Sequence, residues 1–271
     1  MNAEINHIVK LIGINTYAFN ELKYLNKKFY NLFEYCYDKI VINNTKDCKK
    51  LKELQSWCKN NKKLFKINVL VFGENFNQEV TIPDSVTHLN FGCDFNQKVS
   101  IPYSVTHLTF GYLFNTEVII PNSVTDLTFG NDFDQKVIIP NSVTHLTFGD
   151  KFDQEVIIPD SVIHLTFGYW FNTEVIIPNS VTHLTFGEEF NQEVIIPNSV
   201  THITFGYDFD QEVTIPESVT HLTFGYNFDQ EVIIPNSVTY LTFRYCFNKE
   251  VIIPDSVKYL RYPDHPELNI G

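Results

Sequence analysis

Histidine is the residue type in this sequence whose number and spacing could do chemistry. Imidazole nitrogens bind metals and carry protons. A metal site, however, needs ligands that converge from several directions and outer partners that orient them, whereas a column of one residue type approaches from one side. We therefore interpret the column as a repeat feature and predict no metal site. Seven histidines, spaced by 19 residues or twice that, form the column: His88, His107, His145, His164, His183, His202 and His221.

Carboxylates form a second regular column. Like charges that are neighbours repel each other, so these side chains must spread into water. The column is either a solvated edge or a stripe that attracts a basic partner. No P-loop, G-x-G-x-x-G, H-E-x-x-H or G-x-S-x-G motif is present, so we predict a protein that is not an enzyme and needs no cofactor. The column consists of Glu155, Glu174, Glu193, Glu212, Glu231 and Glu250.

The five cysteines are odd in number, scattered and never arranged as C-x-x-C. This pattern argues against a disulfide framework and against a structural zinc site, and it is typical of a reducing compartment. Residues 1–13 lack the basic start and apolar centre of a signal peptide. The sequence therefore predicts a cytoplasmic protein.

Charge divides the chain into two regions. Residues 1–66 contain 13 Lys/Arg and 6 Asp/Glu, whereas the remainder contains 7 and 26. An acidic surface repels phosphate, so we expect no nucleic-acid partner. Apolar runs fall short of the roughly 20 residues of a membrane helix, so we expect no membrane partner either. A protein target is the partner that remains.

A repeat of 19 residues must position these columns. A phenylalanine recurs ten times, from Phe72 to Phe243, and a second follows each one four residues later. Within a unit, Val105, Leu108 and Phe110 have the apolar spacing of a leucine-rich repeat. One such unit cannot bury its apolar face alone, so neighbours must stack, about 4.8 Å apart.

Other positions in the unit predict its turns. Val99 and Ile101, followed by a proline, suggest a second short strand that the proline ends. The recurrent glycine indicates a tight turn or a close approach of two backbones. Asn, Asp and Ser columns suit turns.

The expected fold is mainly β. It is a leucine-rich-repeat-like parallel β-solenoid of ten 19-residue coils with a small α-helical N-terminal cap domain. Residues 1–66 form the helical region, with one helix expected at 48–59, residues 67–262 form the solenoid, and residues 263–271 form a C-terminal cap or tail.

The repeated residues resemble a known family. Each unit reads Phe-Asn or Phe-Asp, Gln-Glu-Val, Ile-Pro, Ser-Val-Thr-His-Leu and Phe-Gly, which is similar to the FNIP repeat, also called IP22. That repeat is abundant in social amoebae and in giant viruses that infect amoebae. For a viral source, the expected location is the host cytoplasm.

The N-terminal region resembles a second motif. A glutamate-led apolar stretch at residues 4–11 and a basic-aromatic stretch at residues 22–32 are similar to the F-box. F-box proteins join a repeat domain to the Skp1 adaptor of a cullin ubiquitin ligase, so the resemblance implies a substrate receptor. The alternative is a plain interaction scaffold in which these helices only cap the first coil. The implied adaptor-binding residues are Ile5, Ile8, Val9, Ile12, Leu22, Leu25, Lys27 and Phe29.

Positions that vary from coil to coil are those that the scaffold does not need. The two positions after the glycine carry tyrosine and tryptophan among acidic residues. Exposed rings of this kind are typical anchors of protein interfaces, although they could also simply cover one another along the rim. The predicted partner-binding residues, taken from this rim and from the histidine column, are Tyr112, Tyr169, Trp170, Tyr207, Tyr226, Tyr245, His164, His183 and His202.

Overall fold

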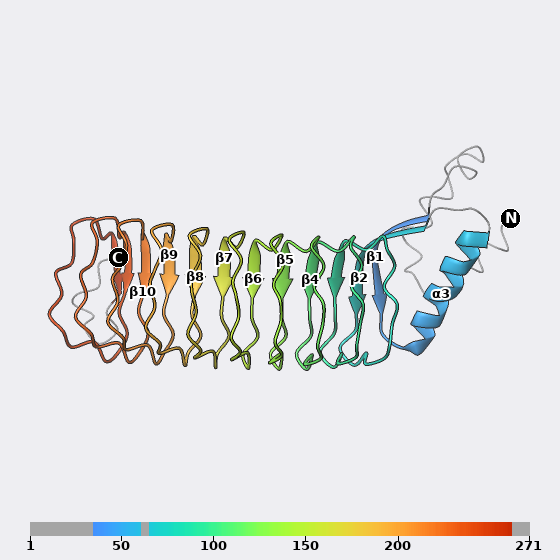
Figure 1. The fold of residues 1–271 in the computed structure, drawn as a ribbon, viewed down its shortest axis with the longest axis horizontal. Helices are drawn as coiled ribbons and strands as arrows, with labels where there is room; N and C mark the ends of the chain where they lie inside the picture. The colour runs from blue at the N-terminus through green and yellow to red at the C-terminus, as the bar shows by residue number, and fades with distance from the viewer. Residues whose placement is uncertain (1–34, 61–64, 262–271) are drawn as a thin grey trace.

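The computed structural model describes residues 35–60 and 65–261. Its strands form one parallel sheet of 12 strands, and each strand pairs with the next one in the sequence (Figure 1). Every strand from β3 onward pairs with the residues 19 positions away, so each coil lies directly on the previous one. The predicted parallel β-solenoid of about ten 19-residue coils is confirmed.

The described N-terminal part is a strand–helix–strand unit. Strand β1 (Tyr35–Ile42) leads into helix α3 (Thr45–Asn60), and β2 (Phe65–Phe72) returns parallel to β1. Leu51 of α3 is buried against the end of the solenoid core. The helix expected at 48–59 is therefore present, whereas β1 was not predicted. No helix in the described residues is long and apolar enough to cross a membrane.

The ten remaining strands are short and alike. In each of them the central leucine or isoleucine is buried and its two neighbours face outward, as the alternation of side chains along a strand requires. They are β3 (His88–Asn90), β4 (His107–Thr109), β5 (Asp126–Thr128), β6 (His145–Thr147), β7 (His164–Thr166), β8 (His183–Thr185), β9 (His202–Thr204), β10 (His221–Thr223), β11 (Tyr240–Thr242) and β12 (Tyr259–Arg261).

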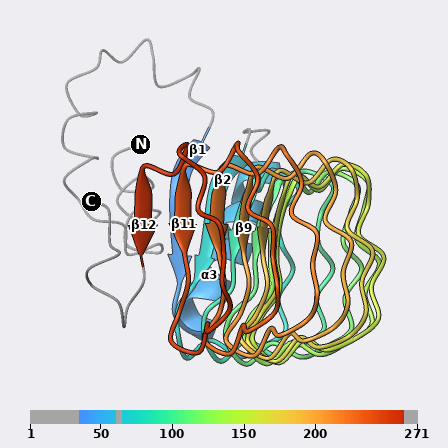
Figure 2. The same cartoon turned by 90° about the vertical axis from the view of Figure 1, so that its left-hand side faces the viewer.

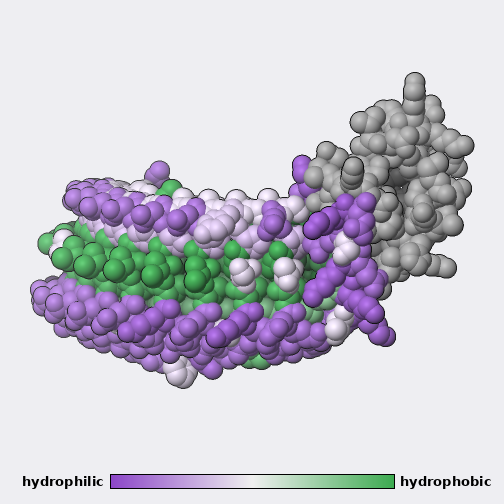
Figure 3. Space-filling view, turned by 45° about the vertical axis from the view of Figure 1, so that its right-hand side comes forward, coloured by the Kyte–Doolittle hydropathy of each residue, from purple (hydrophilic) through white to green (hydrophobic). Residues whose placement is uncertain are grey.

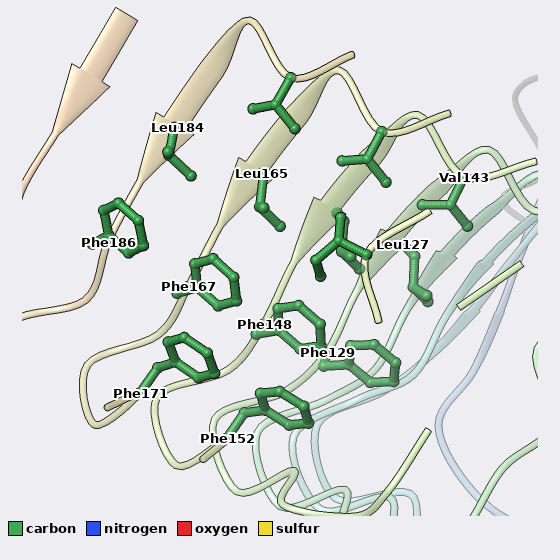
Figure 4. Close-up of a cluster of buried hydrophobic side chains, with 14 of the residues drawn as sticks. Leu127, Phe129, Val143, Phe148, Phe152, Leu165, Phe167, Phe171, Leu184 and Phe186 are labelled. Carbon is green, nitrogen blue, oxygen red and sulfur yellow. The ribbon is translucent and has the colours of Figure 1, made fainter. Parts of the chain in front are cut away.

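Two phenylalanine columns run through the core, as the period predicts (Figure 4). Rings of the first column, which begins at Phe72, lie 5.2–5.8 Å apart from coil to coil. Rings of the second column, which begins at Phe76, lie 6.0–6.3 Å apart. Within one coil the two rings contact each other, at 4.1 Å for Phe167 and Phe171. Leucine and valine columns fill the space beside them.

Short polar side chains join one coil to the next. Ser104 Oγ donates a hydrogen bond of 2.7 Å to the Val86 carbonyl of the preceding coil, and the equivalent serines repeat this bond along the chain. Asn96 Oδ1 accepts from the Asn115 backbone N–H in the following coil. The Asn, Asp and Ser columns therefore satisfy backbone groups, as expected, but they do so between coils rather than within a turn.

The glycine column marks a close contact between backbones. A Cβ added at Gly168 would lie 1.9 Å from the Gly149 carbonyl oxygen, and the other glycines from Gly92 to Gly225 meet the preceding coil in the same way. Of the two expected roles of this glycine, the structure shows the close approach. Arg244 takes the equivalent position in the coil that follows Gly225.

The solenoid curves with its strands on the inner side. The first and last coils are displaced toward the strands relative to the middle coils (Figure 2). The distances agree, because stacked imidazole rings outside the sheet are 4.1–4.5 Å apart and the deepest phenylalanine rings are 6.0–6.3 Å apart. We call the strand side the concave face and the opposite side the convex face.

This curvature corrects one expectation. Val99 is half-buried and Ile101 is buried, as predicted, but residues 99–101 form no strand, and neither do the equivalent residues of the other described coils. Because neighbouring coils spread apart on the side away from the sheet, the segments at these positions are farther apart than the spacing of about 4.8 Å that a ladder of hydrogen bonds needs.

The buried rings should carry much of the stability. Phe167→Ala removes a ring that is 2% exposed and is expected to lower the free energy of unfolding by about 3–5 kcal/mol. Trp170→Ala removes a ring that is 56% exposed and should cost much less. Denaturant unfolding of the two variants measures both values, and a larger loss for Trp170→Ala would contradict these assignments.

Candidate protein-binding surface

The concave face is built from the outward positions of strands β3–β12. Each three-residue strand points its first and third side chains away from the core, and these are histidine and threonine in most coils. A further threonine precedes eight of these ten strands, and its hydroxyl binds the previous coil, as Thr106 Oγ1 does with the Thr87 carbonyl at 3.2 Å. The same hydroxyl lies 2.9 Å from His107 Nδ1 and so fixes the ring's orientation.

The histidines stack in two blocks. His145, His164, His183, His202 and His221 form the longer block, with ring centroids 4.1–4.5 Å apart and planes 12–14° apart. Tyr240 continues the stack 4.3 Å beyond His221. Across the part of the chain that the structure describes, no group of three or more His, Cys, Asp and Glu side chains could hold a metal.

Asp126 separates the two blocks, because it takes the histidine position in β5. Its carboxylate lies 3.5 Å from His107 Nε2 and 3.7 Å from His145 Nδ1. Both rings gain an ion pair with Asp126 when they are protonated. Asp126 therefore interrupts the stack with one carboxylate that contacts a histidine on each side.

Two rings of the longer block disfavour protonation. Partial burial lowers the pKa of His164 below its ordinary value of 6.5, and the neighbours His183 and His145 lower it further. The same causes lower the pKa of His202, through burial first and then His221 and His183. Repulsion between stacked rings is thus present but comes second to desolvation.

An aromatic rim follows the concave face where the chain turns at the glycine column. We define it as the two positions after each glycine. Tyr169 and Trp170 are 46% and 56% exposed. Tyr207, Tyr226 and Tyr245 stack from coil to coil, at 4.6 and 5.1 Å between ring centroids. Three rings therefore cover one another, as one interpretation of the rim expects, whereas Tyr169 and Trp170 stand apart from them.

The structure brings together most of the predicted partner-binding residues. His164, His183 and His202 share one stack, and the rim tyrosines lie at the end of the same strands. Tyr112 is half-exposed on the same rim, three coils before Tyr169. The eight adaptor-binding residues, from Ile5 to Phe29, lie outside the described residues.

Sequence reasoning missed a third surface, on the convex face. Seven isoleucines there are 88% exposed, and Figure 3 shows a continuous hydrophobic stripe along the solenoid between two hydrophilic bands. The signal was available in Val118-Ile119-Ile120, because alternation that turns Val118 and Ile120 inward turns Ile119 outward. The exposed isoleucines are Ile119, Ile138, Ile157, Ile176, Ile195, Ile233 and Ile252.

The histidine stack should make stability depend on pH. An unfolded imidazole titrates near pH 6.5, and the folded pKa values of His164 and His202 lie below that value. The unfolded state then binds more protons as the pH falls below about 6.5, so stability is lost on acidification. The Asp126 carboxylate forms ion pairs with His107 and His145, whereas the expected loss rests on the two other histidines.

Thermal melting at about pH 7.5 and about pH 5.5 tests this expectation. A variant carrying His164→Thr, His183→Thr and His202→Thr should lose less stability on acidification than the unchanged chain. The carboxylates that also titrate in this range are common to both proteins. Equal losses would contradict a contribution from the stack.

Comparison with known proteins gives one match. A model of the FNIP Repeat matches ten overlapping stretches that together span residues 66–262: 66–94, 76–113, 95–132, 114–151, 133–170, 152–189, 171–208, 190–215, 209–246 and 231–262. No curated protein and no solved structure matches. The matched family is a non-catalytic repeat that fits a protein-interaction role. The stretches cover well over half of the chain, and the protein therefore belongs to the FNIP repeat family.

Proposed function

We propose that this solenoid binds a protein partner through its concave face and the adjoining aromatic rim. The observation that carries the proposal is the pair of exposed rings, Tyr169 and Trp170, beside a curved sheet. Solenoids use such extended concave surfaces for binding. Tyrosine and tryptophan are also enriched among the few residues that supply most of the binding energy of an interface.

The charges of the rim indicate the chemistry of the partner. Glu188 and Glu189 stand between Trp170 and the tyrosine stack, and Asp208 lies next to Tyr207 of that stack. An arginine on the partner would find both carboxylates to pair with and ring faces to stack on. We therefore propose a partner segment that is basic and contains apolar side chains, in line with the strong acidic excess of the solenoid.

The double variant Tyr169→Ala and Trp170→Ala tests this proposal. One central anchor that contributes about 2 kcal/mol corresponds to about 30-fold in affinity, so loss of both rings should lower affinity by about 30-fold to 1,000-fold. The full chain is used as bait in a cell extract, and captured proteins are quantified by mass spectrometry. Tyr103→Ala is the matched control, because Tyr103 is 81% exposed but lies outside the rim. Capture of the same proteins by the double variant and the control would contradict a role for the rim.

We further propose that the protein is a substrate receptor, in which the N-terminal region binds Skp1 while the solenoid holds the target. The support is the F-box-like sequence of residues 4–32 and the positive charge of residues 1–66. Such a receptor works in the cytoplasm, where cysteines stay reduced. The competing proposal, a plain scaffold, assigns residues 4–32 to capping alone.

Mixing purified full-length protein with Skp1 distinguishes the two proposals. A receptor should elute with Skp1 as a complex on size-exclusion chromatography, and Ile8→Asp and Leu25→Asp should each abolish that complex. The rim double variant should still bind Skp1, because its changes lie in the middle of the solenoid. Unchanged protein that elutes alone would leave the plain scaffold.

A further inference from the structure

We propose that the convex face joins two copies of this chain back to back, with the row of exposed isoleucines at the centre of the interface. Seven isoleucines at 88% exposure leave a continuous apolar stripe in water (Figure 3). This surface is separate from the concave face and rim, so the inference does not depend on the proposed target binding.

The size of the stripe fits a dimer. An isoleucine this exposed leaves on the order of 100 Å² of apolar surface in water, so the row presents on the order of 700 Å². The largest apolar patch of a typical monomer is about 300–600 Å². A stable interface buries about 800 Å² on each partner, which the row and its polar edges together supply.

Curvature places the best contact at the middle of the row. Two convex surfaces touch where both bulge, which is at the central coils. The uninterrupted isoleucines occupy those coils, from Ile119 to Ile195, whereas Thr81, Ser100 and Thr214 take the same position nearer the ends. The apolar row is therefore unbroken at the central coils, where two copies meet, and polar residues interrupt it toward both ends, although Ile233 and Ile252 follow Thr214 at the C-terminal end.

The charges beside the row select the orientation of the two copies. Two residues before each isoleucine stands a glutamate, such as Glu155 or Glu174, except before Ile138, where Lys136 takes the position; these residues form one edge. Residues three positions after it, mostly asparagines such as Asn141 and Asn179, form the other. A two-fold axis perpendicular to the solenoid would set glutamates against glutamates, which is unfavourable. An axis parallel to the solenoid sets glutamates against asparagines, so the copies run parallel and each coil faces its own counterpart.

Sedimentation of the full chain at about 1–100 μM tests the proposal. The unchanged 31.5 kDa chain should form dimers as its concentration rises. A variant with Ile138→Thr, Ile157→Thr and Ile176→Thr should stay monomeric and folded, because Thr81 and Thr214 already occupy this position. The control changes three concave residues to threonine, at His145, His164 and His183, and should dimerise normally.

Other outcomes overturn the proposal. An unchanged chain that is monomeric throughout, or a threonine variant that still dimerises, excludes the isoleucine row as a self-interface. If the monomeric chain instead binds a different protein and the threonine variant does not, the row is a binding surface for that protein and not a self-interface.

Cross-linking tests the orientation. In a parallel dimer, Ile195→Cys lies opposite its own counterpart, and a short bismaleimide should join the two copies. An unchanged chain treated alike gives the background from native cysteines, among them exposed Cys93. In an antiparallel dimer centred on the same row, position 195 would face position 119, so absence of a cross-link above background in a dimeric sample excludes the parallel arrangement.

Discussion

The structure depends on the hydrogen-bonded contact between one coil and the next. A three-residue strand has no partner within its own coil, so its backbone groups bond to the coils on either side. Phe110 N–H, for example, donates to the Thr128 carbonyl of the following coil at 2.9 Å. This ladder fixes the offset between coils at 19 residues, and every column of identical side chains follows from that offset.

Aligned columns turn many weak contacts into a single core. A phenylalanine such as Phe148 meets one ring in its own coil and one in each adjacent coil, at 4.1, 5.7 and 5.6 Å. An error of one residue in register would turn the inward set of a strand outward and would break the serine bond to the next coil. Apolar packing and polar ladder therefore select the same register, and neither requires a long strand.

The sequence predicted the features that recur in every coil and missed features that depend on strand pairing or on the curvature of the stack. Phe72, Phe76 and their equivalents were assigned to the core because a 19-residue period leaves no other way to bury them. Strand β1 was missed because Asp38 and Lys39 interrupt its apolar pattern, so only pairing with β2 reveals it. A second strand at residues 99–101 was expected from composition alone, and curvature of the stack, which no single coil encodes, prevents it.

The candidate surfaces also contain features that the sequence predicted and features that it could not predict. Tyr169 and Trp170 could be assigned to the outside because they vary between coils. The stacking of Tyr207, Tyr226 and Tyr245 could not be predicted, because it depends on the rotamers that neighbouring coils allow. The exposed isoleucines were overlooked for a different reason, since an apolar residue between two buried ones is easily counted with the core.

The glycine column also bears on how such a chain can change in length. From Gly92 to Gly225, each glycine lies against the backbone carbonyl of the preceding glycine, and this backbone contact does not depend on which side chains the preceding coil carries. Whole coils are thus interchangeable at their junctions, whereas insertion of one residue would put a Cβ where none fits. Gain or loss of a complete coil therefore leaves the contacts between the remaining coils unchanged. The exposed surfaces become longer or shorter by one coil at a time. Duplication of the sequence of one coil can thus lengthen the solenoid without a change in how its core packs.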